Sequence, residues 1–501
     1  MKYIPVIGME VHAELKTVSK MFCACKNGLG QETEPNIHIC PVCTAQPGAL
    51  PTPNRKAIES VQRAGLALGC VLAKHSKFDR KNYFYPDLPK GYQISQYDEP
   101  FCGKGELAIR EGKTVGITRI HMEEDTGKLT HPTPVKGQGP RGASGADYTL
   151  VDLNRAGVPL MELVTEPDID SASDARLFCQ TLRQILRYLD ISDADMEKGQ
   201  MRCEANISIH AEGAEKLSGT KVEVKNINSF RAVEKAIEYE IRRQTEELEA
   251  GRAIVQETRG WDENGQKTVS QRKKESAHDY RYFPEPDIPP FTFTEADFEA
   301  LRRSIPELPA AKETRFAEQF GLFPEAVSVI TAEKPTADYF EAVVSEIRAK
   351  KKSAEIEEGA GIAIRLAANY IVTELRKRLA DIGKTIDTSR ISPENYAEFI
   401  SILADGKINS SAAQTVLGEM LLGGDNDPSH IIDRLNLAQM SDTGELEGIV
   451  DAILAANAKS VEDYKAGKQN AFQFLIGQIM KETKGKANPK IVSDILKQKL
   501  T

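Results

Sequence analysis

The chain has 501 residues, more than one hydrophobic core supports, so we expect two to four domains. Hydrophobic residues make up 40% and charged residues 28%, which is typical of a water-soluble protein, and no apolar run is long enough to span a bilayer. A net charge of −9 excludes a surface that binds nucleic acid everywhere. The polar residues Glu10 and His12 interrupt the N-terminal segment too early for the apolar region of a signal peptide, so we expect a cytoplasmic protein.

The first predicted strand, residues 4–15, interleaves apolar with polar residues. Glu10 and His12 stand two positions apart, so a strand would point both side chains to the same face. A single hydrogen-bonded histidine is one interpretation. A metal or phosphate site is the other, if acidic residues face this pair.

Two close pairs of cysteines follow, Cys23 with Cys25 and Cys40 with Cys43. Thiols stay reduced in the cytoplasm, and this pattern is typical of a structural zinc site rather than of disulfides. Four unrelated buried cysteines are the alternative, and His38 is a possible substitute ligand. A closed site of four thiolates leaves no coordination position for catalysis, so the predicted role is to hold a loop.

Asn54 can cap a helix that runs to Leu72, with apolar residues spaced for one buried face. The stretch 78–96 mixes aromatic residues, cations, amides and prolines, and it fits neither a clean strand nor a helix. Such a loop suits contact with phosphate or RNA, while a purely structural aromatic loop is the alternative.

An acidic centre, residues 121–128, follows a β-branched run at 116–120 that predicts a strand. Adjacent carboxylates repel one another unless a cation lies among them, and Mg²⁺ prefers oxygen ligands. The residues alone do not choose among Glu123, Glu124 and Asp125, and a solvated acidic turn is the alternative.

Further half-polar strands are predicted at 151–168, 202–210 and 220–230, and Asn264-Gly265 predicts a hairpin turn. Ser171 and Asp174 predict a capping box that opens a helix. Repeated half-polar strands indicate an antiparallel sheet with one core face and one polar face.

Five stretches together resemble the B-subunit family of the aspartyl/glutamyl-tRNA amidotransferases, and the likeness covers essentially all 501 residues in unbroken order. These stretches are Val6–His12, Phe78–Asp87, His121–Asp125, Val151–Arg155 and Asp279–Asp287. The resemblance implies an α+β fold: an N-terminal antiparallel-sheet cradle domain with helices, an all-α helical domain and a small helical tail domain. We place these domains at residues 1–293, 294–404 and 405–501.

The resemblance also implies site residues. The implied Mg²⁺ ligands, which are also catalytic residues, are Glu10, His12, Glu124 and Glu162. Lys90 matches the residue thought to gate an ammonia path. The predicted ATP-binding residues are Arg80, Lys81, Asn82, Tyr83, Asn154 and Arg155.

The second half of the chain shows helical spacing of apolar residues at 313–323, 336–352 and 361–382. From Lys459 to Thr501 there are nine lysines and four acids, a local charge of +5 that leaves −14 on the rest. The resemblance implies that this tail binds tRNA, and lysine–phosphate contacts would account for its charge.

The implied reaction is ATP-dependent amidation of Glu-tRNA(Gln) or Asp-tRNA(Asn), the aminoacyl carboxylate being phosphorylated before ammonia attacks it. No amidase signature occurs in this chain, so ammonia would come from a glutaminase A subunit, with a small C subunit completing a heterotrimer. Two alternatives stay open: a non-catalytic, zinc-containing tRNA-binding subunit, and a ligase that uses a free amino acid.

Overall fold

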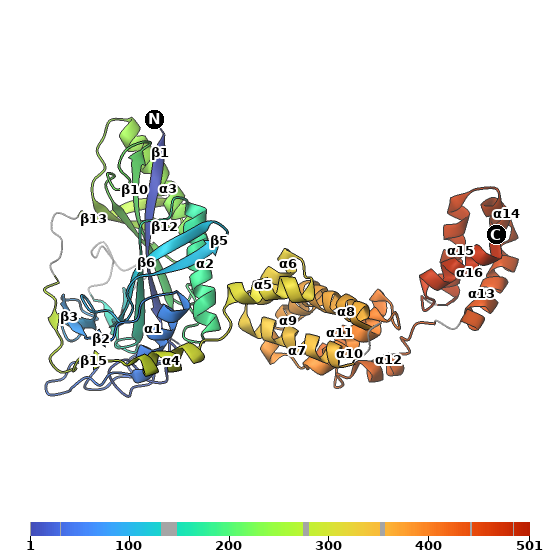
Figure 1. Ribbon diagram of the computed structural model, residues 1–501, viewed down its shortest axis with the longest axis horizontal. Helices are drawn as coiled ribbons and strands as arrows, with labels where there is room; N and C mark the ends of the chain where they lie inside the picture. The colour runs from blue at the N-terminus through green and yellow to red at the C-terminus, as the bar shows by residue number, and fades with distance from the viewer. Residues whose placement is uncertain are drawn as a thin grey trace, which may run out of the picture. The chain divides into compact units, whose positions relative to one another are not determined.

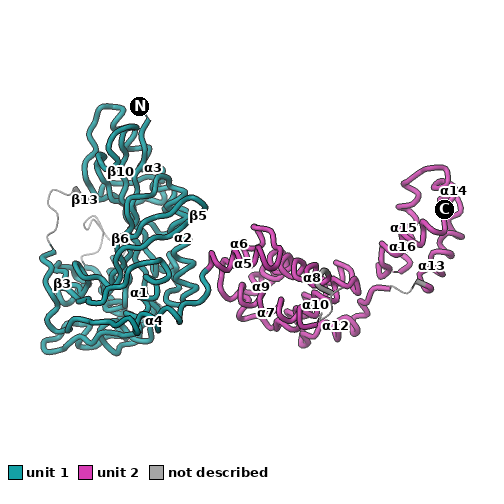
Figure 2. Tube along the Cα trace, in the orientation of Figure 1, with its two compact units in different colours: residues 1–308 teal, residues 309–501 magenta. Residues whose placement is uncertain are grey.

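The computed structural model describes residues 2–30, 32–131, 148–273, 280–350, 356–440, 443–483 and 485–500. The chain forms two compact units, Met1–Leu308 and Pro309–Thr501 (Figure 2). The first unit ends later than the predicted residue 293, because helix α4 (Glu295–Arg303) contacts helix α1 (Arg55–Ala67) and Leu308 packs on the first core. Asp279, which opens one of the family-like stretches, lies outside the described residues.

An eight-stranded sheet forms the centre of the first unit, in the order β13-β12-β11-β10-β1-β9-β6-β5 (Figure 1). The strands are β1 (Tyr3–Glu14), β5 (Gly105–Arg110), β6 (Lys113–Glu124), β9 (Pro159–Thr165), β10 (Met201–Ala211), β11 (Val222–Ile227), β12 (Glu257–Asp262) and β13 (Lys267–Lys273). Every neighbouring pair is antiparallel except β11 and β12, which helix α3 (Phe230–Glu249) connects. The α+β prediction is confirmed, and the sheet is mixed at this one crossover.

The two faces of the sheet differ as the sequence predicts. In β10, Cys203, Ala205 and Ile207 are buried in a core shared with α3 and helix α2 (Ala172–Tyr188), while Arg202 and Glu204 are only partly buried on the other face. Apolar and polar residues therefore alternate because one face packs against helices and the other is left for polar groups.

Three local predictions had different outcomes. Asn54 caps α1, as expected, and the Asn264-Gly265 turn joins β12 to β13. Ser171 caps α2 by accepting the N–H of Asp174, but the Asp174 carboxylate binds Arg110 instead of closing a capping box. The box is half formed because a guanidinium offers the carboxylate a stronger, two-point interaction.

Smaller strand pairs flank the main sheet. The stretch 78–96, which the sequence assigns to a loop, contains strands β3 (Asp79–Asn82) and β4 (Tyr92–Ser95), paired with each other and with β14 (Phe283–Pro284). The remaining pairs join β2 (His75–Ser76) to β15 (Phe291–Thr292) and β7 (Lys128–Thr130) to β8 (Leu150–Asp152). The family-like stretches around residues 80 and 283 are thus hydrogen-bonded partners.

The second unit is helical, with two separate hydrophobic cores. The first core is built by α5 (Pro309–Phe320), α6 (Pro324–Thr331), α7 (Lys334–Lys350), α8 (Ile356–Tyr370), a π-turn (Ile371–Leu375), α9 (Arg376–Asp381), α10 (Pro393–Ala404), α11 (Ser410–Leu422) and α12 (Pro428–Leu435). The second is built by α13 (Thr443–Ala456), α14 (Ala458–Lys465), α15 (Gln469–Glu482) and α16 (Pro489–Leu500).

The change of core falls between Leu437 and Met440, later than the predicted residue 405. Ala413, Val416 and Leu417 of α11 are fully buried in the first core. A boundary at 405 would therefore divide one hydrophobic core. Among the described residues, no helix has the length and apolar character that crossing a bilayer requires.

Candidate active site

Three neighbouring strands bring two histidines and a glutamate into one row on the polar face. The pairing of β1 with β9 sets His12 opposite Glu162, and the pairing of β9 with β6 sets Glu162 opposite His121. Residues opposed in this way on one face have their side chains within contact distance. Sheet register, rather than nearness in sequence, assembles the centre of the site.

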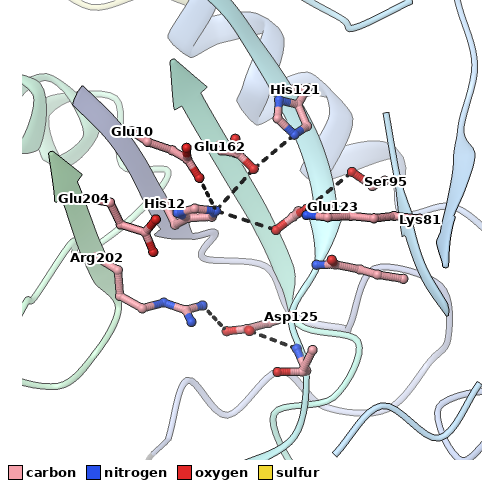
Figure 3. A network of polar contacts seen from close by, with 12 residues as sticks. Glu10, His12, Lys81, Ser95, His121, Glu123, Asp125, Glu162, Arg202 and Glu204 are labelled. Atoms are coloured by element: carbon pink, nitrogen blue, oxygen red, sulfur yellow. Dashed lines mark hydrogen bonds and ion pairs between the residues drawn. The ribbon is translucent and has the colours of Figure 1, made fainter. Parts of the chain in front are cut away.

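Carboxylates surround His12 (Figure 3). Its Nε2 lies 3.2 Å from Glu162 Oε2, 3.8 Å from Glu123 Oε1 and 3.9 Å from Glu10 Oε1. The same Glu162 oxygen is 3.2 Å from His121 Nε2. We call Glu10, His12, His121, Glu123 and Glu162 the carboxylate cluster.

The cluster carries more negative charge than its own histidines offset. Burial and the neighbouring carboxylates of Glu162 and Glu204 raise the pKa of Glu10 to about 7. Burial lowers the pKa of His12, but its hydrogen bond with Glu162 and the other carboxylates outweigh this and raise it to about 9. Both directions indicate a place where positive charge is stabilised.

The register of β1 with β10 brings a further carboxylate close to the cluster. Glu10 on β1 lies directly opposite Glu204 on β10, and facing like charges destabilise a strand pair. Lys225 partly offsets this, with Nζ 2.6 Å from Glu204 Oε2. An arrangement that costs stability within the sheet indicates a functional site.

The donor atoms suit a divalent cation. Glu10, His12 and Glu162 offer one ligand atom each within 4.8 Å of one another, and His121, Glu123 and Glu162 do the same. Carboxylate oxygens with one imidazole nitrogen match the ligand preferences of Mg²⁺ or Mn²⁺. Three of the four predicted ligands therefore lie together.

Glu124, the fourth predicted ligand, is not brought into the cluster. The sequence predicts a strand only at residues 116–120, with the acids following it, but β6 continues through Glu124, so Glu123 and Glu124 point to opposite faces. Glu124 Oε2 is 2.7 Å from Lys90 Nζ, and its Oε1 accepts the Ile94 N–H. Glu123, and not Glu124, lies within reach of His12 and Glu162.

Of the six predicted nucleotide-binding residues, Lys81 reaches the cluster. Its Nζ lies 3.6 Å from Glu123 Oε2, and although burial lowers its pKa, the charge of Glu123 raises that pKa above the usual value. Tyr83 stands beside it, where burial raises the tyrosine pKa and the charge of Lys81 opposes that rise. The Tyr83 hydroxyl donates to Gln93.

The other four predicted nucleotide-binding residues are engaged in structural contacts. Arg80 forms a two-point ion pair with buried Glu285, and Asn82 donates to the backbone of residues 280 and 281. Asn154 bonds the backbone of the cysteine loop at Glu34 and His38. Arg155 donates to the carbonyls of Thr126 and Gly127.

Sequence reasoning missed His121 as a member of the site and left Glu123 among alternatives. The signal that identifies both is their two-residue spacing within a single strand that also pairs with the strand of Glu162.

Asp125, the next acid along the chain, forms a different interaction: Arg202 donates a hydrogen bond to its carboxylate at 2.8 Å. Burial raises the pKa of Asp125, but Arg202 and Arg155 outweigh this and lower it.

The four cysteines of the predicted zinc site come together. Their sulfur atoms all lie within 4.8 Å of one another, and Cys40 Sγ is 3.8 Å from Cys43 Sγ. Thiolates arranged tetrahedrally around zinc at about 2.3 Å would stand about 3.8 Å apart. A hydrogen bond with Cys23 lowers the pKa of the Cys43 thiol to about 5. Geometry and chemistry therefore fit a structural zinc ion.

The cysteine loop is anchored next to the site. The fully buried ammonium of Lys20 donates to the carbonyls of His38 and Leu153, and the Met21 N–H donates to Gly157. Gly157 has φ +85°, and a Cβ there would stand 3.8 Å from Cys43 Cβ and 3.9 Å from Glu124 Oε2. Ordering this loop therefore also orders the surroundings of Glu124.

We expect the purified protein to contain about one zinc ion per chain. Cys40→Ser should lower the thermal midpoint by several degrees and release the metal, because zinc binding contributes directly to loop stability. Elemental analysis and thermal unfolding provide the measurement, and Cys70→Ser serves as the control because Cys70 lies outside the group. Zinc-free protein with reduced thiols, purified without chelator, would contradict the assignment.

Comparisons with known proteins identify the family of the chain. The GatB/GatE catalytic domain family matches residues 5–299, and the GatB domain family matches residues 338–500. Three relatives each carry the name of the B subunit of an aspartyl/glutamyl-tRNA(Asn/Gln) amidotransferase. The protein of Carboxydothermus hydrogenoformans is 48% identical over 502 residues, with 100% of this chain and 99% of the relative covered.

The protein of Caldanaerobacter subterraneus is 48% identical over 504 residues, and that of Persephonella marina is 47% identical over 503. Both alignments cover 100% of each chain. These matches confirm the resemblance noted in the sequence. The chain belongs to the B-subunit family of the aspartyl/glutamyl-tRNA(Asn/Gln) amidotransferases.

Proposed function

We propose that this chain is the kinase and transamidase subunit of a glutamine-hydrolysing aminoacyl-tRNA amidotransferase, a carbon–nitrogen ligase. Its substrates would be Glu-tRNA(Gln), Asp-tRNA(Asn) or both, and its location the cytoplasm, where charged tRNA is used. The observation that carries the proposal is the carboxylate cluster, whose His12 contacts carboxylates from three strands.

The chemistry requires activation of a carboxylate. A carboxylate resists attack by ammonia because it has no good leaving group. Attack of a carboxylate oxygen on the γ-phosphorus of ATP forms an acyl phosphate and releases ADP. Ammonia then attacks the acyl carbon, the C–N bond forms as the C–O bond to phosphate breaks, and phosphate and a proton leave. Phosphoryl transfer needs positioning and charge neutralisation more than a covalent nucleophile, and the cluster offers groups of this kind.

Glu10, His12 and Glu162 would hold Mg²⁺, with Glu123 in reach. The ion would neutralise phosphate charge during transfer. His121 supports Glu162 from the far side: burial alone would raise the pKa of Glu162, but His121 and His12 hold it well below its usual value, keeping the carboxylate ionised as a ligand. Lys81 adds a cation at the edge of the cluster, beside Glu123.

The Lys90–Glu124 pair is proposed as the ammonia gate. Both groups are largely buried, Lys90 with 13% and Glu124 with 3% of the side chain exposed, and they meet on the face of β6 opposite Glu123. Ammonia in water is mostly protonated, so a sheltered route is required for the neutral nucleophile. A buried ion pair can close such a route and open it by separating.

We expect Lys90→Met combined with Glu124→Gln to lower glutamine-dependent amidation about tenfold or more while phosphorylation of the charged tRNA stays within about threefold. Changing both residues avoids an unpaired buried charge. Amidation and phosphorylation are measured separately, and Lys16→Met is the control because Lys16 forms an ion pair with the exposed Asp190. Normal glutamine-dependent amidation in the double variant would contradict the proposal that the Lys90–Glu124 pair is the ammonia gate.

The proposed partners are a glutaminase A subunit and a small C subunit, since subunit naming in the family implies a multi-subunit enzyme. ATP and misacylated tRNA complete the proposed set of ligands. The alternative, a non-catalytic zinc-containing tRNA-binding subunit, accounts for the cysteines and the lysine-rich tail. It leaves the carboxylate cluster, and the Glu204 that faces Glu10 across the strand pair, without a role.

The deciding experiment supplies the complex with γ-labelled ATP, Mg²⁺ and separately Glu-tRNA(Gln), Asp-tRNA(Asn) or a free amino acid. Label appearing on charged tRNA, with amide formed after glutamine is added, supports the proposal. Turnover with free amino acid alone favours a different ligase. Binding of tRNA without any label transfer favours the non-catalytic alternative.

A further inference from the structure

Several aromatic side chains in the segments around strands β3, β4 and β14 are unusually exposed. The exposed fractions are 82% for Phe84, 62% for Tyr97, 61% for Tyr85, 45% for Phe283 and 36% for Tyr280. Large aromatic groups in water are costly when they cluster, so a concentration of them indicates a binding surface. They come from two segments far apart in sequence, which the pairing of β3 with β14 joins.

Four tyrosines form a connected set within this region, Tyr83, Tyr97, Tyr280 and Tyr282, which we call the tyrosine platform. The rings of Tyr97 and Tyr282 are stacked, with centroids 4.5 Å apart and an interplanar angle of 13°. Tyr280 meets Tyr282 edge-on at 6.1 Å and Tyr83 at 6.0 Å. The Asp79 carboxylate accepts a hydrogen bond from the Tyr97 N–H, which fixes the backbone at the most exposed residue of the platform.

Lys81 links the platform to the cluster. Its Nζ lies 5.2 Å from the centroid of the Tyr280 ring and 3.6 Å from Glu123 Oε2. Burial and the charges of Glu123 and Glu162 raise the pKa of Tyr282 to about 12, against the opposing charge of Lys81. The tyrosine platform and the carboxylate cluster are therefore adjacent, with Lys81 between them.

We propose that the tyrosine platform is a base-stacking subsite, with the exposed ring of Tyr97 receiving one unpaired nucleobase. This inference rests on the proposed function. A flat ring supported from behind by a second ring accepts any base, and an adjacent cation suits the attached phosphate or ribose. Two nucleotides have chemistry that fits: ATP, and the 3′-terminal nucleotide of tRNA, which carries the amino acid to be phosphorylated.

The test measures equilibrium binding of ATP with Mg²⁺, and separately of unacylated tRNA, to the full-length chain with its co-purifying partners. Tyr97→Leu keeps an apolar side chain but removes the stacking face. We expect it to weaken one of the two affinities by about 5- to 150-fold, the range for one base–aromatic stack. Tyr97→Phe keeps the face and should bind within about twofold of wild type.

Phe323→Leu is the matched control, since Phe323 is a comparably exposed aromatic residue (75%) that belongs to the other compact unit. If only the affinity for ATP falls, the stacked base is that of ATP. If only the affinity for tRNA falls, and a transcript without its 3′ nucleotide shows no such difference between variant and wild type, the stacked base is the terminal base of tRNA. Unchanged affinities for both ligands overturn the proposal. So does an equal loss in Tyr97→Phe, or a failure of the complex to assemble in place of a loss of ligand affinity.

These outcomes separate the subsite from the proposed function. If wild-type complex binds ATP and tRNA but transfers no phosphoryl group, the proposed function fails while the Tyr97 binding series still tests the platform. If phosphoryl transfer occurs and the Tyr97 series shows no change, the platform alone fails.

Discussion

Replacing His12 with alanine is expected to lower phosphorylation of the charged tRNA at least about a hundredfold, equivalent to about 2.7 kcal/mol of barrier. His12 lies at the centre of the cluster, with Nε2 between 3.2 and 3.9 Å from the carboxylates of Glu10, Glu123 and Glu162. Removing the imidazole takes away a metal ligand and leaves the carboxylates to repel one another, which weakens positioning of the phosphates.

The measurement is transfer of labelled phosphate to charged tRNA at limiting Mg²⁺, with tRNA affinity determined in parallel. Affinity for tRNA should stay within about threefold, because the lysine-rich tail belongs to the other compact unit. Wild-type turnover in His12→Ala would show that the cluster is not the metal site.

Glu123→Gln and Glu124→Gln form a matched pair that tests the strand geometry. The two residues are adjacent and chemically identical, but Glu123 faces His12 and Glu124 faces Lys90. We expect Glu123→Gln to lower phosphorylation at least about tenfold and Glu124→Gln to leave it within about threefold. The opposite ranking would favour the ligand set that the family resemblance implies.

Ending the chain after Ala438 is expected to weaken tRNA binding at least about tenfold while the rest of the protein stays folded. The removed segment has its own hydrophobic core, and exposed lysines follow its helices at positions 459, 465, 468, 481, 490, 497 and 499. Each lost phosphate contact should reduce the slope of log affinity against log salt by about 0.7 to 0.9.

Cutting at residue 405 would not test the tail, because α11 and α12 belong to the preceding core. Binding of tRNA is measured across a salt series for the full chain, the truncated chain and Lys481→Gln with Lys490→Gln. The double variant should lie between the other two. Equal affinity and equal salt slope in the full and truncated chains would mean that the tail does not bind the RNA.

The sequence by itself determined the polar face of the sheet, the cysteine group and most of the helices. Two-residue alternation placed Glu10 and His12 together, and the spacing of Cys23, Cys25, Cys40 and Cys43 identified the thiol group. These features are local: they follow from the geometry of one strand or one loop. The family, too, was recognisable from short stretches in unbroken order.

Only the tertiary structure decided which acid joins the site. Glu123 and Glu124 are equivalent in composition, and the end of β6 determines which of them faces His12. The same holds for Arg80 and Asn154. Their side chains suit phosphate binding, but in the structure Arg80 is paired with Glu285 and Asn154 is hydrogen-bonded to the cysteine loop. Contacts between segments more than a hundred residues apart depend on strand register, which the spacing of residues within one segment does not contain.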